Sequence, residues 1–459
     1  MATVTSSAPR PRVPLRLLLL LIAVLTWSDF GVRVLLPALQ APHWPNPAYW
    51  VAARLAVEGN ADLIYADRDV FFQQAARLGT VPDIFEANMP TTILVFLPLA
   101  PFSETTARTI WDLLMLLCYI LPCAILFHAL APTRTIEIGL WALAPVFHPW
   151  RENISRGQAY PLLFLLLVVG AVLGLRHHDT QSQTESQRTG RTQIVAGLAF
   201  GLFAIVKLYY VAILLLPVLF WRRWRLLITA IALFVFAAVA TIALWGSEQW
   251  VRALGFAVTW RDRPESAVTA YQTLNSWLTH LLRYDATYNP GPVVNVPALV
   301  GWLWWAGALV MLSLTGWALY IHRRVAGTRS GTFAQGLLPM ALMVPLALVL
   351  APVAEDYHFV LALFSILVVM RALWDIYARQ AAEDEPHARR PILAATITLF
   401  AAVLLLGAPW RFNMAGVEGW RSLLYYPRLY GALMLWALVM GLLIGERRSA
   451  AVPTPDISR

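Results

Sequence analysis

The sequence is poor in charged residues, which make up only 13% of its 459 positions, whereas hydrophobic residues make up 59%. One soluble core cannot hide so many apolar side chains, so the composition excludes an ordinary soluble protein and predicts a polytopic membrane protein. No regular alternation of apolar and polar residues indicates a membrane strand. Because unpaired backbone groups are too costly in lipid, the membrane-spanning segments are expected to be helices.

Cysteines and the common soluble motifs are scarce too. The two cysteines, Cys118 and Cys123, lie in one apolar stretch, and their spacing does not favour a disulfide within a helix. We interpret them as small core residues. The patterns CxxC, HExxH, GxGxxG and Walker A are absent. This removes the commonest signatures of soluble nucleotide chemistry and zinc hydrolysis, and we expect no metal site, no cofactor and no nucleic-acid partner.

Apolar stretches of about 20 residues, the length that a membrane-spanning helix needs, recur along the chain. They predict an all-α bundle of about 10–12 transmembrane helices in a single membrane domain, residues 1–459. A shorter stretch, 89–102, carries three prolines and is expected to be a broken or re-entrant segment. The expected spans are 14–35, 107–130, 134–150, 158–175, 194–220, 226–245, 295–321, 333–351, 359–375, 391–408 and 429–445.

Arginine clusters indicate the orientation of these spans. They precede the first span, follow the segments that end near 220 and 321, and close the chain, so by the positive-inside rule these ends are cytoplasmic. Loops 36–88 and 246–294 then lie outside, and linker 176–193 and tail 446–459 inside. Apolar residues recur at helical spacing in "AYWVAARLAVEGNADLIY" and "DRDVFFQQAARLG", which predicts two amphipathic surface helices in the first outer loop.

Lysine is almost absent, and the single one, Lys207, lies inside the apolar segment 194–220. An ionisable residue in such a place usually faces a cavity or a partner. The segment is long enough to form two half-helices that meet at Lys207 near the outer surface, and the ammonium would then bind a phosphate or pyrophosphate. The alternative is a lysine that snorkels to the membrane surface from an ordinary helix.

Six motifs follow one another between residues 45 and 365, and together they carry a family resemblance. They are "YW.AAR…EG…IY", "NMPTTILVFLPLAP", "NISRGQAYPLLFLLL", "AGLAFGLFAIVKLYYVAILLLPVLFWRRWR", "TLNSWL" and "DYHFVLAL". In this order they resemble the bacterial polyprenol-phosphate-mannose-dependent mannosyltransferases of the GT-C superfamily and their uncharacterised relatives. The order is more specific than any one motif.

The resemblance implies an integral-membrane inverting glycosyltransferase of the bacterial cytoplasmic membrane, with its active site facing outward. Such an enzyme takes a sugar, mannose in the best-understood relatives, from a polyprenyl-phosphate donor. It transfers the sugar to a lipid-linked or glycan acceptor, with membrane lipids around it. Lys207 would then meet the donor phosphate. The resemblance also implies substrate-binding roles for Tyr49, Asn275 and His358, which lie within the quoted motifs.

A polar collar, residues 151–158, precedes the apolar run of the third motif. For a glycosyltransferase, the amides of Asn153 and Gln158 can bind sugar hydroxyls, and Arg151 or Arg156 can bind the phosphate. The collar is therefore interpreted as the hydrogen-bonding floor of the site.

The expected catalytic base is missing from its usual place. The family usually has an acidic residue four positions before the first aromatic of the "YW" pair, and here that position is Pro45. Other candidates are His43 and the group Glu355, Asp356 and His358. Asp29 is preferred because it is the only carboxylate between Arg16 and Glu58, and Asp356 is second. Asp29 could instead pair with Arg33, four residues on.

Two other classes stay open at this point. Many spans, intramembrane charge and proline-broken helices also describe a secondary transporter, although the halves of the chain do not repeat one another. The chain could also be a catalytically silent homologue that binds polyprenyl phosphate.

Overall fold

The computed structural model describes residues 14–175, 183–326, 332–383, 389–410 and 419–450. Of the predicted linker 176–193, residues 176–182 lie outside the described residues, as does the end of the predicted tail, and the rest of the linker belongs to the helix Gln183–Val206. The described residues form helices and no strand, which confirms the all-α membrane fold. Eight of the described helices are long and apolar enough to cross a membrane: Leu15–Gln40 (α1, η1, α2), Glu104–Leu130 (α6), Trp224–Trp245 (α13), Ala298–Arg324 (in α16, Ala298–Ala326), Phe333–Leu350 (α17), Asp356–Ala381 (η7 and most of α18), Arg390–Gly407 (α19) and Pro427–Gly445 (in α20, Pro427–Ala450).

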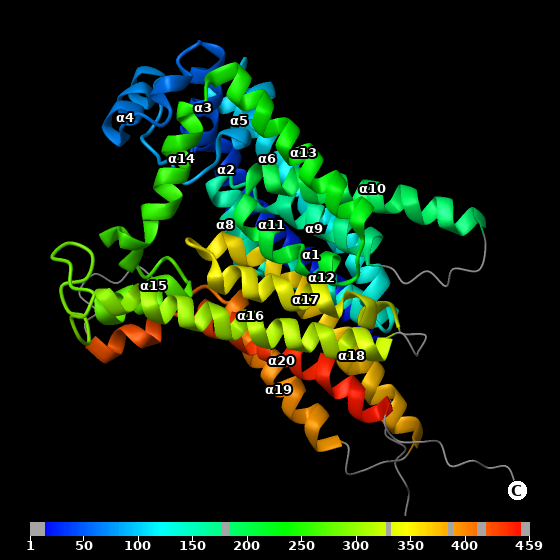
Figure 1. The fold of residues 1–459 in the computed structure, drawn as a ribbon. Coiled ribbons are helices and arrows are strands. Elements are labelled where there is room, and N and C mark those ends of the chain that lie inside the picture. Colours follow the sequence, from blue (N-terminus) through cyan, green and yellow to red (C-terminus); the bar gives the residue numbers. More distant parts are fainter. Residues whose placement is uncertain (1–13, 176–182, 327–331, 384–388, 411–418, 451–459) are drawn as a thin grey trace, which may run out of the picture.

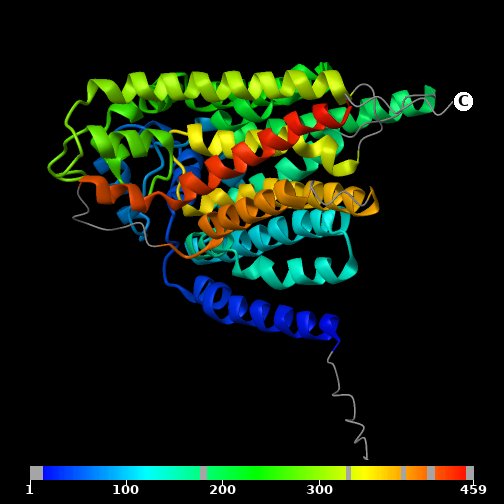
Figure 2. The same cartoon turned by 90° about the horizontal axis from the view of Figure 1, so that it is seen from below.

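Other helices complete the bundle. They are α3 (Ala48–Val57), α4 (Arg68–Arg77), α5 (Pro90–Phe96), α7 (Arg134–Leu143), α8 (His148–Arg156), α9 (Tyr160–Gly174), α10 (Gln183–Val206), α11 (Leu208–Leu214), α12 (Leu216–Phe220), α14 (Glu248–Thr259) and α15 (Leu274–Leu282). The long helices run side by side, and α3, α4, α14 and α15 gather at one end of the bundle (Figures 1 and 2). The start of α10 and the end of α20 lie at the opposite end (Figure 2).

The burial of the helices separates a protein core from a lipid-facing surface. α17 packs against α11, α18 and α20. Of the most apolar 18-residue stretch of each helix, 83% of the residues are buried in α17, but only 11% in the first helix and in α19. Large apolar side chains such as Phe236 and Trp302 are more than two-thirds exposed. A soluble protein rarely exposes such continuous apolar surface, whereas a bilayer covers it.

Three of the eleven expected spans, 134–150, 158–175 and 194–220, are not among the eight helices that are long and apolar enough to cross a membrane. The stretch 134–150 forms α7, which has ten residues, then a short 3-10 turn, and then α8. A helix of ten residues is about 15 Å long, half the thickness of the hydrocarbon core. Pro145 and Pro149 lie at the turn, where each limits the continuation of a helix. The short stretch 89–102 is broken as expected, with α5 ending at Phe96 before Pro98.

The first long loop (residues 41–89) contains the two predicted helices, and each ends before a glycine of positive φ, Gly59 or Gly79. α3 does not lie on the surface, however. Seven of its ten residues are buried, and it packs against α5. The loop therefore folds into the end of the bundle.

The apolar segment around Lys207 is broken into two helices, as its length predicts. α10 ends at Val206, Lys207 has an extended backbone (φ −146°, ψ 83°), and α11 begins at Leu208. The hydroxyls of Thr91 and Thr92 on α5 donate to the carbonyls of Ile205 (2.8 Å) and Val206 (3.1 Å). These bonds satisfy carbonyls that the end of a helix leaves without partners.

Candidate active site

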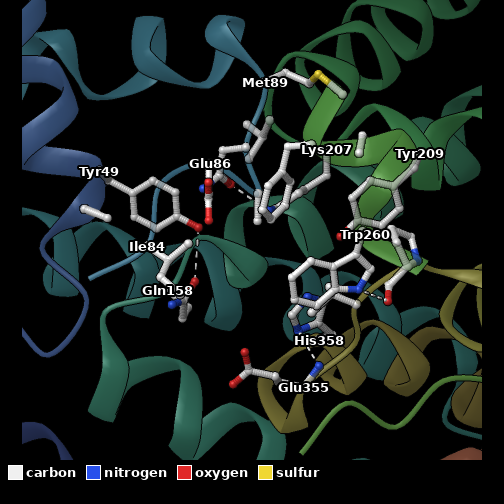
Figure 3. Close-up of a pocket in the computed structure, with 18 of the residues that line it drawn as sticks. Tyr49, Ile84, Glu86, Met89, Gln158, Lys207, Tyr209, Trp260, Glu355 and His358 are labelled. Atoms are coloured by element: carbon white, nitrogen blue, oxygen red, sulfur yellow. Dashed lines mark hydrogen bonds between the residues drawn. The ribbon is translucent and has the colours of Figure 1, made fainter. Parts of the chain in front are cut away.

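A cavity of about 170 Å³ lies where the first long loop, the turn from α8 into α9, the Lys207 break, α14 and η7 (Asp356–Leu361) meet (Figure 3). Its polar lining residues are Asn46, Tyr49, Asp83, Glu86, Asn88, Gln158, Tyr160, Lys207, Tyr209, Tyr271, Glu355, Tyr357 and His358. Its apolar lining residues are Ala48, Ile84, Ala87, Met89, Val206, Leu208, Ala253, Phe256, Ala257, Trp260, Pro352 and Val353.

Lys207 enters the cavity from the break between α10 and α11 and is 7% exposed. Its ammonium donates a hydrogen bond of 2.6 Å to the Asn88 side-chain oxygen (Figure 3). Asn88 is itself held in place. Its side-chain NH2 donates to the backbone carbonyl of Phe85, and its backbone carbonyl accepts from the Tyr65 hydroxyl. No carboxylate of the described residues forms an ion pair with Lys207, so a neutral side chain is the partner of this cation.

Gln158 is the collar residue that lines the cavity, and its side-chain oxygen accepts a hydrogen bond of 3.1 Å from the Tyr49 hydroxyl. The preceding Gly157 positions it. Gly157 has φ 63°, and a Cβ there would lie 2.0 Å from the ring nitrogen of Trp44. Only glycine fits both the left-handed backbone and this space. The tight turn from α8 into α9 thus directs Gln158 to the cavity.

η7 contributes Glu355, Tyr357 and His358 to the cavity wall. The backbone N–H of Glu355 donates to Nδ1 of His358 at 3.0 Å, so a neutral imidazole carries its proton on Nε2. Arg156 forms an ion pair with Glu355 (3.2 Å) and lies over the ring of Tyr357. Burial raises the pKa of Glu355, and the charge of Arg156 acts against this rise.

The class of chemistry comes from a family match. The model of glycosyltransferase family 87, a GT-C-type family, matches residues 88–345, which is more than half of the chain. The chain belongs to this family. No curated protein and no solved structure matches the sequence. With its membrane-spanning helices, this family 87 protein is a membrane glycosyltransferase.

The structure brings four of the sequence-predicted site residues of the glycosyltransferase to the cavity: Lys207, Gln158, Tyr49 and His358. Asn153 and Arg156 support the wall from behind. The amide of Asn153 donates to the carbonyls of Pro149 and Tyr357, both at 2.7 Å, and so ties α8 to η7.

The other predicted residues lie away from the cavity. Asp29 on α1 forms ion pairs of 2.9 Å with Arg33 and with Arg151. Asn275 is buried in α15 and does not line the cavity.

Asp356 likewise belongs to a separate polar cluster behind the wall of the glycosyltransferase cavity. It forms ion pairs with Arg428 and with His148 (3.5 Å). Arg428 also donates to the carbonyls of Leu406 and Ala408. This cluster ties η7 to the beginning of α20 and to the end of α19.

Sequence reasoning missed the acidic residues of the segment 83–89, which leads into the second motif of the glycosyltransferase. Asp83 is half-buried, and burial raises its pKa to about 6, although backbone groups of Ile84 and Ala48 and the charge of Arg156 lower it. Its position directly before the motif was the one available signal. Among the described residues, no group of three or more His, Cys, Asp and Glu side chains could hold a metal ion.

A second salt-bridge cluster is built on Glu86, which lines the cavity. Glu86 pairs with Arg68 at the start of α4 (2.5 Å) and with Arg263 (3.6 Å), and Arg68 also reaches Glu265 at 3.5 Å. These pairs join the first long loop to the loop after α14.

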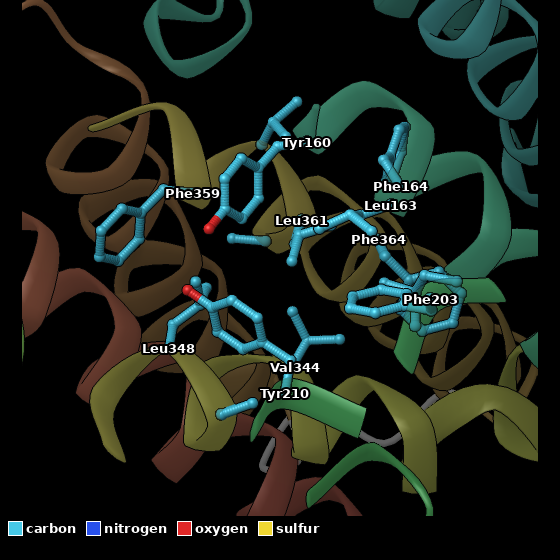
Figure 4. Close-up of a cluster of buried hydrophobic side chains, with 14 of the residues drawn as sticks. Tyr160, Leu163, Phe164, Phe203, Tyr210, Val344, Leu348, Phe359, Leu361 and Phe364 are labelled. Atoms are coloured by element: carbon cyan, nitrogen blue, oxygen red, sulfur yellow. The ribbon is translucent and has the colours of Figure 1, made fainter. Parts of the chain in front are cut away.

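Below the cavity, Tyr160 and Tyr210 stand on a tightly packed apolar base of the glycosyltransferase that includes Leu163, Phe203 and Val344 (Figure 4). The base of the site is thus part of the buried core.

Proposed function

We propose that this membrane glycosyltransferase transfers a sugar, mannose in the simplest case, from a polyprenyl-phosphate donor to a hydroxyl of a lipid-linked or glycan acceptor. The reaction takes place on the outer face of a bacterial cytoplasmic membrane. The observation that carries the proposal is Lys207, a buried cation in a cavity of a family 87 chain with only a neutral protein partner.

The phosphate of the donor is the natural partner of this cation. An ammonium has three N–H donors, and Asn88 accepts one of them. A buried charge is costly unless it is paired, so a ligand that brings a negative charge into the cavity gains more than it would at the surface. We therefore place the donor phosphate at Lys207.

The apolar side of the cavity suits the isoprenoid part of the donor. Met89, Leu208 and Phe256 form this side, and α14 covers it. The opposite face of α14 exposes Val251 and Val258, which are 68% and 76% exposed and which a bilayer would cover. One helix thus separates the cavity from the lipid, and a prenyl chain that leaves beside α14 stays in an apolar environment.

Neutral hydrogen-bonding groups surround the remaining space. Gln158 and Tyr49 are joined to each other, and the Nε2–H of His358 and the hydroxyl of Tyr209 add further donors. Sugar hydroxyls need such paired donors and acceptors. The ring of Trp260, whose N–H donates to the carbonyl of Pro352, offers an apolar surface to a sugar ring.

A transfer assay tests the proposal. Purified protein is incubated with radiolabelled polyprenyl-phosphate-mannose and a mixture of membrane acceptors. Label that appears in an acceptor supports the enzyme. Donor binding without transfer would indicate a silent homologue, and neither binding nor transfer would favour transport.

A further inference from the structure

Three carboxylates line the cavity among the described residues, and their environments differ. Glu86 is held by Arg68 and Arg263, and Glu355 is held by Arg156. Both therefore already neutralise arginines of the protein. Asp83 forms no ion pair with any described residue, so its carboxylate is the one of the three that a substrate can use without breaking a salt bridge.

Asp83 lies in the last part of the first long loop, and its carboxylate faces the backbone of Ala48 at the beginning of α3. The charged and titratable groups that face it come from three elements. They are Tyr49 on α3, Arg156 on α8, and Glu355 and Tyr357 at η7. Arg156 favours the ionised form of Asp83, whereas the negative charge of Glu355 opposes it.

We propose that Asp83 is the general base of sugar transfer, a role that rests on the proposed function. The Asp83 carboxylate takes the proton of the acceptor hydroxyl while the acceptor oxygen forms a bond to the anomeric carbon of the donor sugar. The bond between this carbon and the phosphate oxygen breaks. Its electron pair leaves with the polyprenyl phosphate, which gains one negative charge, and Lys207 stabilises that charge.

The carboxylate has the properties that this step requires. A base works best when its pKa lies near the working pH, because it is then both deprotonated and able to hold a proton. Half-burial raises the pKa of Asp83 to about 6, so the group is mostly ionised at pH 7 and more basic than a free aspartate. Asp29 and Asp356 lack this access, since each is paired with arginine outside the cavity.

The test compares Asp83→Asn with Asp62→Asn, an exposed carboxylate of the same loop that does not line the cavity. Asp83→Asn should bind labelled polyprenyl-phosphate-mannose as the wild type does and transfer the sugar about a hundredfold to ten-thousandfold more slowly. Asp62→Asn should do both normally. Transfer by Asp83→Asn within about threefold of the wild type, or loss of its donor binding, would overturn the role.

The pH profile gives a second measurement that does not depend on how the variant folds. A base must be deprotonated, so wild-type transfer should rise with pH up to a midpoint near 6 and then level off. The residual transfer of Asp83→Asn should lack this rise, and Asp83→Glu should keep part of the rate. A wild type that transfers equally well at pH 5 and pH 7 would refute Asp83 as the base. A wild type that does not transfer at all would refute the proposed function instead.

Discussion

Lys207→Met removes the charge from the cavity and nearly keeps the length of the side chain. In the wild type the ammonium is 7% exposed and donates to Asn88 at 2.6 Å. The substitution leaves the Asn88 oxygen without this donor, which costs about 1–3 kcal/mol. It also removes a buried charge whose desolvation opposes folding. These effects oppose each other, so we expect the variant to fold.

Donor binding should change far more than stability. Removing one partner of a buried charge pair costs about 2–5 kcal/mol of binding free energy. At 1.4 kcal/mol for each factor of ten, this corresponds to an affinity about 30-fold to 4000-fold lower. Lys207→Arg should recover part of the loss, because it restores the charge but replaces a compact ammonium with a planar fork.

Direct binding of labelled polyprenyl-phosphate-mannose to purified protein measures this effect, with thermal unfolding as the check on folding. Arg33→Met is the matched control. Its guanidinium is 77% exposed and pairs with Asp29 away from the cavity. Equal donor affinity in Lys207→Met and wild type would show that the phosphate does not lie at Lys207, and the placement of the donor would fail with it.

Three further predictions concern Asp29, Arg428 and Ala87. Asp29→Asn should transfer sugar at nearly the wild-type rate, because it breaks only a partly exposed pair worth about 1 kcal/mol or less; a hundredfold loss of transfer would restore Asp29 as the base. Arg428→Met should destabilise the protein by about 3–5 kcal/mol, because it leaves the buried Asp356 with His148 as its one remaining ion-pair partner. The measurement is the unfolding temperature in detergent, which should fall; an unchanged temperature would contradict the prediction. Ala87→Cys, at the exposed rim, should react with a membrane-impermeant thiol reagent on intact cells, and reaction only after permeabilisation would reverse the topology.

Most of the fold could be predicted, because a long apolar run in a lipid bilayer forms a helix. The expected spans at 226–245, 333–351 and 429–445 match α13, α17 and α20 within a few residues at their beginnings. The span at 134–150 failed because hydropathy averages over Pro145 and Pro149, which break the run into pieces too short to cross.

The site could be predicted where a single charged residue lies in an otherwise apolar segment. Lys207 was found because a lone cation in an apolar segment must face something polar, and the break at that residue follows from the length of the segment. The alternative reading of Asp29, a pair with Arg33 four residues on, is confirmed. The other partners were not predictable, because Arg151 lies 122 residues from Asp29 and Arg428 lies 72 residues from Asp356 in sequence.

Asp83 was missed for the opposite reason. It is an ordinary acidic residue of a loop, and only the folding of that loop against the beginning of α3 brings it to the cavity. Pro45, the position at which the mannosyltransferases that the sequence resembles usually have an acid, lies three residues before the same end of α3. A base can therefore reach this place from a different part of the loop.

The cavity holds a cation and a carboxylate that do not pair with each other, although each would be stabilised by such a pair. Lys207 bonds to a neutral amide, and Asp83 forms no ion pair among the described residues. Elsewhere in the same loop the protein pairs its charges, as Glu86 with Arg68 shows. Keeping two opposite charges apart lowers stability, and this is tolerated where a ligand uses both. A phosphodiester at Lys207 and a hydroxyl at Asp83 are the two groups that a sugar transfer brings together.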